Sequence, residues 1–118
     1  MSRKVFALRL AVVAAAGPAH AQSRPPQFAG CVACHSVTPD KQPKIGPGLH
    51  GVVGRKAGSL PNYKYSPAMK AYGKPWSRAA LIAYLTNPNG AVPGNKMVYP
   101  PQKPEVAAAI ADYLAGLK

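Results

Sequence analysis

The chain has 118 residues, of which 15 are Lys or Arg and 3 are Asp or Glu, so its formal net charge at pH 7 is +12. This length allows one domain, and no apolar run approaches the roughly 18 residues of a spanning helix, which argues against an integral membrane protein. The 2 cysteines are too few for a disulfide-dense scaffold.

The first 21 residues have the pattern of a secretory signal peptide. Arg3 and Lys4 form a basic start, residues 10–16 form a short apolar core, and small residues lead to Ala21. This order of segments is what a signal peptidase substrate shows. We expect cleavage after Ala21 and export to the periplasm; a buried amphipathic helix and a retained anchor are the alternatives.

Cleavage leaves a mature domain over residues 22–118. It removes three basic residues and no acidic one, so the net charge falls from +12 to +9. Pro and Gly then make up about a quarter of the chain, a composition at which disorder becomes a serious option. Either the mature protein is partly disordered, or something other than side chains fills its centre.

Residues 26–35 can form a short helix that the preceding prolines keep from extending toward the N-terminus. On such a helix, Cys31 and Cys34 share one face, and His35 lies four residues from Cys31 on that face. The spacing C-x-x-C-H is typical of covalent c-type haem attachment, with the imidazole as an iron ligand. We therefore predict one covalent haem c and its iron.

Three other interpretations of the cysteine pair are weaker. A thioredoxin-like motif needs a βαβ context, which the pattern of the chain does not show. A plain disulfide leaves the adjacent His35 unexplained. A zinc site lacks further ligands, since His50 is the one other histidine of the mature chain.

Three more helices are expected further along the chain, over residues 66–72, 77–87 and 104–117. The second begins with a Ser cap and ends before Pro88, and the third begins with Pro and Glu. Their apolar faces are formed by Leu81, Tyr84 and Leu85 and by Val106, Ile110, Tyr113, Leu114 and Leu117. Long stretches rich in Gly and Pro separate the helices, and no strand alternation persists. The predicted fold is all-α, with three to five short helices and long loops wrapped around the haem.

The sixth position of the iron separates an electron carrier from a gas binder or an enzyme. Met69, Met97 and His50 are the candidate ligands. Met97 ends an irregular loop between the two best helices, and a loop that presents a thioether inward explains this stretch of Pro and Gly. Met69 lies in a short helix, where packing is its default role. We predict Met97.

With CVACH at position 31, GPGLHGVVGRKAG at 46–58, NP at 87 and PGNKM at 93, the chain resembles the small monohaem class I cytochromes c, of the mitochondrial and short soluble bacterial types. The resemblance covers nearly the whole mature chain and implies the small cytochrome c fold. It implies that Cys31 and Cys34 hold the haem and that His35 and Met97 are the axial ligands.

The resemblance also implies further haem contacts. The Pro47 carbonyl accepts a hydrogen bond from the other ring nitrogen of His35. Donors to the haem propionates are Arg55, Tyr65 and Trp76. Contacts on the Met97 side are Tyr84, which hydrogen-bonds the sulfur, and Tyr99, which covers the exposed haem side. Packing against the macrocycle involves Leu49, Leu85 and Ile110. For each aromatic residue the alternative is core packing.

Some positions depart from the family pattern. No Gly stands about two turns before Cys31, although Phe28 is present and is expected to pack on Tyr113. Met69 replaces a buried polar Asn. Several positions around the expected haem edge are often basic in the family. Three of them are neutral here, Gly30, Asn89 and Gly90, whereas Lys44, Lys96 and Lys103 remain basic.

The resulting hypothesis is a soluble carrier, not an enzyme, that moves one electron between respiratory or photosynthetic membrane complexes or dehydrogenases and an oxidase. Its charge of +9 steers a monomer onto acidic patches of oxidase, reductase or dehydrogenase partners. Weak contact with anionic membrane surfaces is compatible with that role, and nucleic acid is not an expected partner. The alternative is a haem peroxidase or a gas-binding sensor with a labile sixth ligand. Without haem, the mature chain is expected to be largely unfolded.

Overall fold

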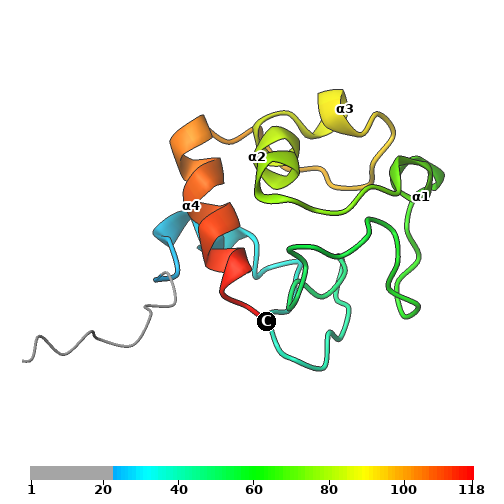
Figure 1. The fold of residues 1–118 in the computed structure, drawn as a ribbon, viewed down its shortest axis with the longest axis horizontal. Helices are drawn as coiled ribbons and strands as arrows, with labels where there is room; N and C mark the ends of the chain where they lie inside the picture. The colour runs from blue at the N-terminus through cyan, green and yellow to red at the C-terminus, as the bar shows by residue number, and fades with distance from the viewer. Residues whose placement is uncertain (1–22) are drawn as a thin grey trace, which may run out of the picture.

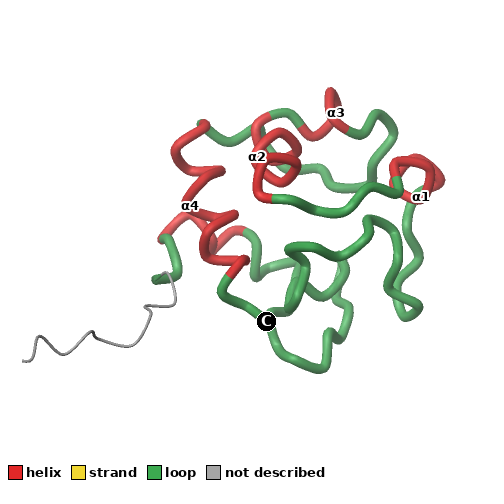
Figure 2. Tube along the Cα trace, in the orientation of Figure 1, coloured by secondary structure: helices red, strands yellow, loops and turns green. Residues whose placement is uncertain are grey.

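The structure, a computed structural model, describes residues 23–118, so the signal peptide expected over residues 1–21 lies outside the described residues. In chain order the elements are the 3₁₀ helix η1 (Pro26–Gly30), α1 (Pro67–Tyr72), α2 (Arg78–Thr86), α3 (Pro88–Ala91) and α4 (Pro104–Ala115). Long loops join them and form much of the molecule (Figure 1; Figure 2). Between residues 23 and 118 no helix is both long and apolar enough to cross a membrane.

Side-chain caps fix where the middle helices begin. Ser66 accepts a hydrogen bond from the backbone N–H of Met69, and Ser77 accepts one from Ala80, both at 3.1 Å. These bonds satisfy N–H groups that a helix start leaves without partners. Helix α1 ends at Gly73, whose left-handed backbone (φ 52°) lets its N–H bond to the Met69 carbonyl. The expected helices over 66–72 and 77–87 are therefore present, to within a residue at each end.

Two elements differ from expectation. The helix expected over residues 26–35 is a 3₁₀ helix up to Gly30, and residues 31–34 continue it as a turn. Pro88 ends α2 as expected, but it also begins α3. The cause is Asn87, whose backbone leaves the helical region (φ −156°, ψ 79°) and whose side chain caps the N–H of Gly90 at 3.0 Å.

Helix α4 packs against α2 and against η1, which lies beside it in Figure 1. The rings of Phe28 and Tyr113 meet edge to face with centroids 4.8 Å apart, which confirms the expected contact. Ile110 and Leu114 of the predicted stripe on α4 are buried as expected. Ala107 and Ala111 are fully buried as well, whereas Tyr113 is half-buried. Small side chains at these positions let the helices approach closely.

Candidate functional site

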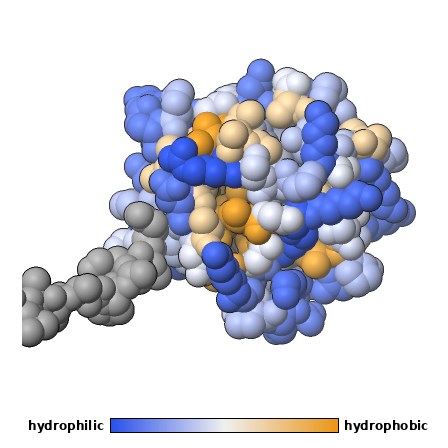
Figure 3. Space-filling model, viewed as in Figure 1, coloured by the Kyte–Doolittle hydropathy of each residue, from blue (hydrophilic) through white to orange (hydrophobic). Residues whose placement is uncertain are grey.

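A cavity of about 620 Å³ lies between the helices and the loops. Its walls are mostly apolar, and hydrophobic side chains grouped along the face drawn in Figure 3 are bordered by hydrophilic ones. The residues predicted from the sequence to contact or ligate a haem all line this cavity, and they are Cys31, Cys34, His35, Pro47, Leu49, Arg55, Tyr65, Trp76, Tyr84, Leu85, Met97, Tyr99 and Ile110. The long, Pro- and Gly-rich loops thus surround an apolar space rather than lying disordered.

The two cysteines stand on one helical turn at the cavity wall. The backbone N–H of His35 donates to the carbonyl of Cys31 at 2.9 Å, and this bond between residues four apart is the pattern of an α-helix. Both thiols are free and half-buried. Burial raises the pKa of the Cys31 thiol, and the nearby positive charge of Arg24 partly offsets this. The cysteines are therefore available for bonds to a group inside the cavity.

The ring of His35 is oriented by its neighbours. Its Nδ1 lies 2.7 Å from the Pro47 carbonyl oxygen. A carbonyl can only accept, so Nδ1 carries the proton and Nε2 keeps a free lone pair. Burial is the largest effect on the pKa of His35 and lowers it, which favours the neutral imidazole. Such a ring is prepared to ligate a metal through Nε2.

Gly46 provides the space in which the His35 ring lies. A Cβ at position 46 would stand 2.7 Å from Nδ1 and 2.8 Å from Nε2 of that ring, closer than real contacts allow. The Gly46 N–H also donates to the Cys34 carbonyl at 2.8 Å, which ties this loop to the cysteine turn. This role of Gly46 was not predicted from the sequence.

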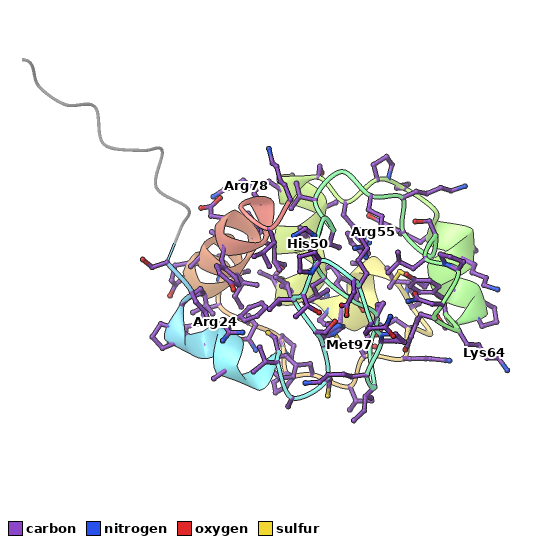
Figure 4. The ribbon with its side chains drawn as sticks, turned by 90° about the horizontal axis from the view of Figure 1, so that it is seen from below. Arg24, His50, Arg55, Lys64, Arg78 and Met97 are labelled. Carbon is purple, nitrogen blue, oxygen red and sulfur yellow. The ribbon has the colours of Figure 1, made fainter. Side chains whose placement is uncertain are left out.

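Arg55 places a positive charge at the cavity wall. Its guanidinium donates to the carbonyls of Gly48 at 2.8 Å and His50 at 2.6 Å (Figure 4). Burial lowers the pKa of Arg55, and Tyr65 acts in the opposite direction. None of the described residues that line the cavity is a carboxylate. A group that carries acidic substituents would therefore find a partly buried cation here.

Several aromatic side chains pack against one another at the cavity wall. Trp76 stacks on Tyr72 with centroids 5.3 Å apart and lies tilted on Tyr84 at 5.1 Å. Tyr65 is buried, and its hydroxyl oxygen accepts from the Leu60 N–H at 3.3 Å. The resemblance implies that Arg55, Tyr65 and Trp76 donate to the haem propionates, and all three line this one cavity.

Tyr84 has a hydrogen-bond partner that the sequence did not point to. Its phenol donates to Asn95 Oδ1 at 3.3 Å, and the expected bond to the Met97 sulfur stays a prediction. Asn95 presents a stronger acceptor than a thioether does, and it stands between Tyr84 and the Met97 backbone. One feature of the sequence could have pointed to this role of Asn95. It stands in the turn of residues 93–97, and Asn favours turns because its side chain forms hydrogen bonds to nearby backbone.

The two methionines considered as ligands both line the cavity. His50 is not among the described residues that line it, so the structure leaves two thioethers as candidates. Tyr99, two residues after Met97, lies with its hydroxyl directly against Gly30 and thus spans from the Met97 loop to the cysteine turn.

These features fit a haem c. The cavity has the size range of ligand sites, about 300–1,000 Å³, and its apolar walls suit a macrocycle. Cys31 and Cys34 can form the two thioether bonds, His35 offers an imidazole nitrogen, and Arg55 offers a cation to the acidic edge of the group. This donor set, rather than a set of zinc ligands, is what the structure brings together.

Comparison with known proteins agrees with this fit. The chain is 46% identical over 94 residues to cytochrome c2 iso-2 of Magnetospirillum fulvum, an alignment that covers 79% of this chain and 97% of the relative. It is 46% identical to cytochrome c2 of Rhodomicrobium vannielii, with 75% and 71% covered. No protein-family model matches the chain.

Solved structures give the same result for the fold. Cytochrome cH from Methylobacterium extorquens superposes with a TM-score of 0.69 at 41% identity, covering 75% of this chain and 89% of the other. Cytochrome c2 from Rhodospirillum centenum superposes with a TM-score of 0.71 at 32% identity, covering 76% and 91%.

Proposed function

The chain belongs to the class I monohaem c-type cytochromes, with covalent haem c as its cofactor, and on this premise we propose that it is a periplasmic carrier of single electrons whose iron is ligated by His35 and Met97. The observation that supports this best is that both side chains line one cavity with the two cysteines, while Pro47 holds the His35 ring with Nε2 free. On this proposal residues 1–21 direct export and are removed by cleavage after Ala21.

The protein residues serve the electron transfer by holding the site still. When bound, haem c supplies an iron that takes up and releases one electron. The apolar walls exclude water, which disfavours the extra positive charge of the oxidised state. Pro47 fixes the His35 ring through a 2.7 Å contact, and a thioether from Met97 is a soft, neutral donor. If His35 and Met97 ligate the iron in both its oxidised and its reduced state, these side chains would need little rearrangement when the electron is transferred.

Three lysines lie on the exposed part of the cavity lining. Lys56, Lys64 and Lys96 are exposed residues that also line the cavity. Beside them, Ile45 and Val98 are exposed apolar residues, with 77% and 99% of their surfaces accessible. Cations around an apolar centre suit brief contact with acidic patches on an oxidase, reductase or dehydrogenase, in which charge speeds the encounter. Weak contact with anionic membrane surfaces uses the same charges.

The peroxidase or gas-sensor alternative has less support. An iron-based peroxidase needs an acid–base group near an open iron position. Among the described residues that line the cavity, His35 is the sole imidazole and none is a carboxylate. We therefore propose a carrier that is not an enzyme.

The ligand assignment is tested by the weak thioether-to-iron charge-transfer band of the ferric protein. We expect Met97→Ala to lose this band and to bind added imidazole readily. Met69→Ala is the matched control, because Met69 also lines the cavity, and it should keep the band. A band that survives in Met97→Ala and disappears in Met69→Ala would reverse the assignment.

The carrier role is tested by stopped-flow oxidation of the reduced protein by candidate membrane oxidases at several ionic strengths. Charge-steered encounters slow steeply as salt rises, because exposed charges are screened beyond about 10 Å at 0.1 M salt. Rates that do not change with salt would contradict docking through the lysines.

A further inference from the structure

The side chain of Asn95 is the centre of a hydrogen-bond network beside Met97. Its Nδ2 donates to the carbonyl of Val92 at 2.9 Å, to the carbonyl of Pro88 at 3.2 Å and to Oδ1 of Asn89 at 3.2 Å. These acceptors belong to α3 and the residue after it. The amide half of Asn95 therefore holds the loop against that short helix.

The oxygen half of Asn95 faces the other way. Its Oδ1 accepts from the backbone N–H of Met97 at 2.8 Å and from the Tyr84 hydroxyl at 3.3 Å. Both partners are donors, which fixes the orientation of the carboxamide. Within the described residues, the Asn95 side chain is thus the hydrogen-bond partner through which the Met97 backbone is joined to α2 and α3.

Tyr84 gives this network a rigid base. It is 7% exposed, packs on Trp76 and lines the haem cavity. Burial raises the pKa of Tyr84 to about 12, so its phenol remains a donor to Asn95 at neutral pH. Asn95 also lines a second, smaller pocket of about 330 Å³, together with Met97 and Tyr99.

We propose that Asn95 is a positioning residue for the sixth ligand: its carboxamide holds the Met97 backbone against α2 and α3 and thereby sets how readily the thioether leaves the iron. The inference rests on the proposed role of Met97. It predicts that loss of the carboxamide increases the population in which the sixth position is open. An added ligand that binds the open form then gains apparent affinity in proportion to that population.

The test is an imidazole titration of the ferric holoprotein at neutral pH, followed by absorbance. Asn95→Ala should raise the apparent affinity for imidazole about tenfold or more, which corresponds to about 1.4 kcal/mol. Asn89→Ala is the matched control, since it removes a single contact to Nδ2, and it should stay within about twofold of wild type. Asn95→Asp keeps an acceptor for Met97 N–H but loses the donor bonds to Pro88, Asn89 and Val92, so its imidazole affinity should lie between that of wild type and that of Asn95→Ala.

A second measurement does not depend on ligand exchange at iron. Hydrogen exchange of the Met97 amide, measured by NMR in the reduced protein, should be faster in Asn95→Ala and near normal in Asn89→Ala. If Asn95→Ala lowers the unfolding midpoint while imidazole affinity and Met97 exchange stay as in wild type, Asn95 is merely structural and the proposal is wrong. If Asn95→Ala does not fold, Tyr84→Phe removes one of the two contacts to Oδ1 and should raise imidazole affinity by a smaller factor; no change would again overturn the proposal.

Met97→Ala distinguishes a failure of the role proposed for Asn95 from a failure of the ligand assignment. If it binds imidazole tightly while Asn95→Ala behaves as wild type, this inference fails and the ligand assignment stands. If Met97→Ala keeps the charge-transfer band, the proposed function itself fails.

Discussion

Replacing Gly46 by Ala should disturb the His35 side of the site. The added Cβ would lie 2.7 Å from Nδ1 and 2.8 Å from Nε2 of His35, and contacts below 3.0 Å require one group to move. The neighbour is a ring held by the Pro47 carbonyl at 2.7 Å, not the free end of a flexible side chain. The ring therefore moves only if that hydrogen bond is lost.

The expected cost follows from these two effects. A half-buried donor left without its acceptor costs about 1–3 kcal/mol. Forcing an extra methyl group into a packed site costs about 1–3 kcal/mol more. We expect Gly46→Ala to lower the free energy of unfolding by about 2–6 kcal/mol.

Guanidinium unfolding of the ferric holoprotein, followed by far-ultraviolet circular dichroism, measures this loss, and the haem absorption spectrum reports on His35. Gly54→Ala is the control, because Gly54 has a positive φ of 86° and nothing within 4 Å of its Cβ position. Its cost is backbone strain of about 1–2 kcal/mol, with an unchanged spectrum. The reasoning is refuted if Gly46→Ala keeps both wild-type stability and the wild-type spectrum.

Three further predictions concern the core, the cavity charge and the surface. Phe28 is fully buried, so Phe28→Ala should lower the unfolding free energy by about 3–5 kcal/mol in the same assay, and a loss below about 1 kcal/mol would contradict its core role. Arg55→Gln should lower the reduction potential measured by redox titration, because the partly buried cation disfavours the oxidised state. Lys118→Gln, on an exposed residue, should change the potential little, and equal shifts in the two variants would argue against a local effect. The hydrogen bond from Arg78 holds the pKa of Asp112 below its usual value, so the stability from this pair is present above the ordinary carboxyl pKa and is lost as pH falls through the lowered value. Asp112→Asn should accordingly destabilise slightly at neutral pH and not in strong acid, and an equal loss at both pH values would contradict the ion pair.

The parts of the fold that were predictable are those set by neighbours in sequence. Ser77 and the prolines fix helix starts through local hydrogen bonds and a fixed φ, and the spacing from Cys31 to His35 needs one helical turn. The aromatic pair of Phe28 and Tyr113 was reached by resemblance and is present.

The parts that were not predictable depend on contacts between distant segments or on weak sequence signals. Ala107 and Ala111 form the most buried face of α4, yet alanine gives little hydrophobic signal, so the predicted stripe followed the larger side chains instead. Helix α3 is too short to show a period. The partners of Asn95 lie on α2 and α3, so its role became visible only in three dimensions.

The packing of η1 against α4 also makes the cysteine turn depend on the far end of the chain. Phe28 meets Tyr113 edge to face, so the segment just before Cys31 is covered only when the last helix has folded back onto it. In a chain that has not yet folded, nothing from α4 covers this segment. On the proposed route of export, the turn is therefore open to haem attachment until α4 arrives and closes the fold over it.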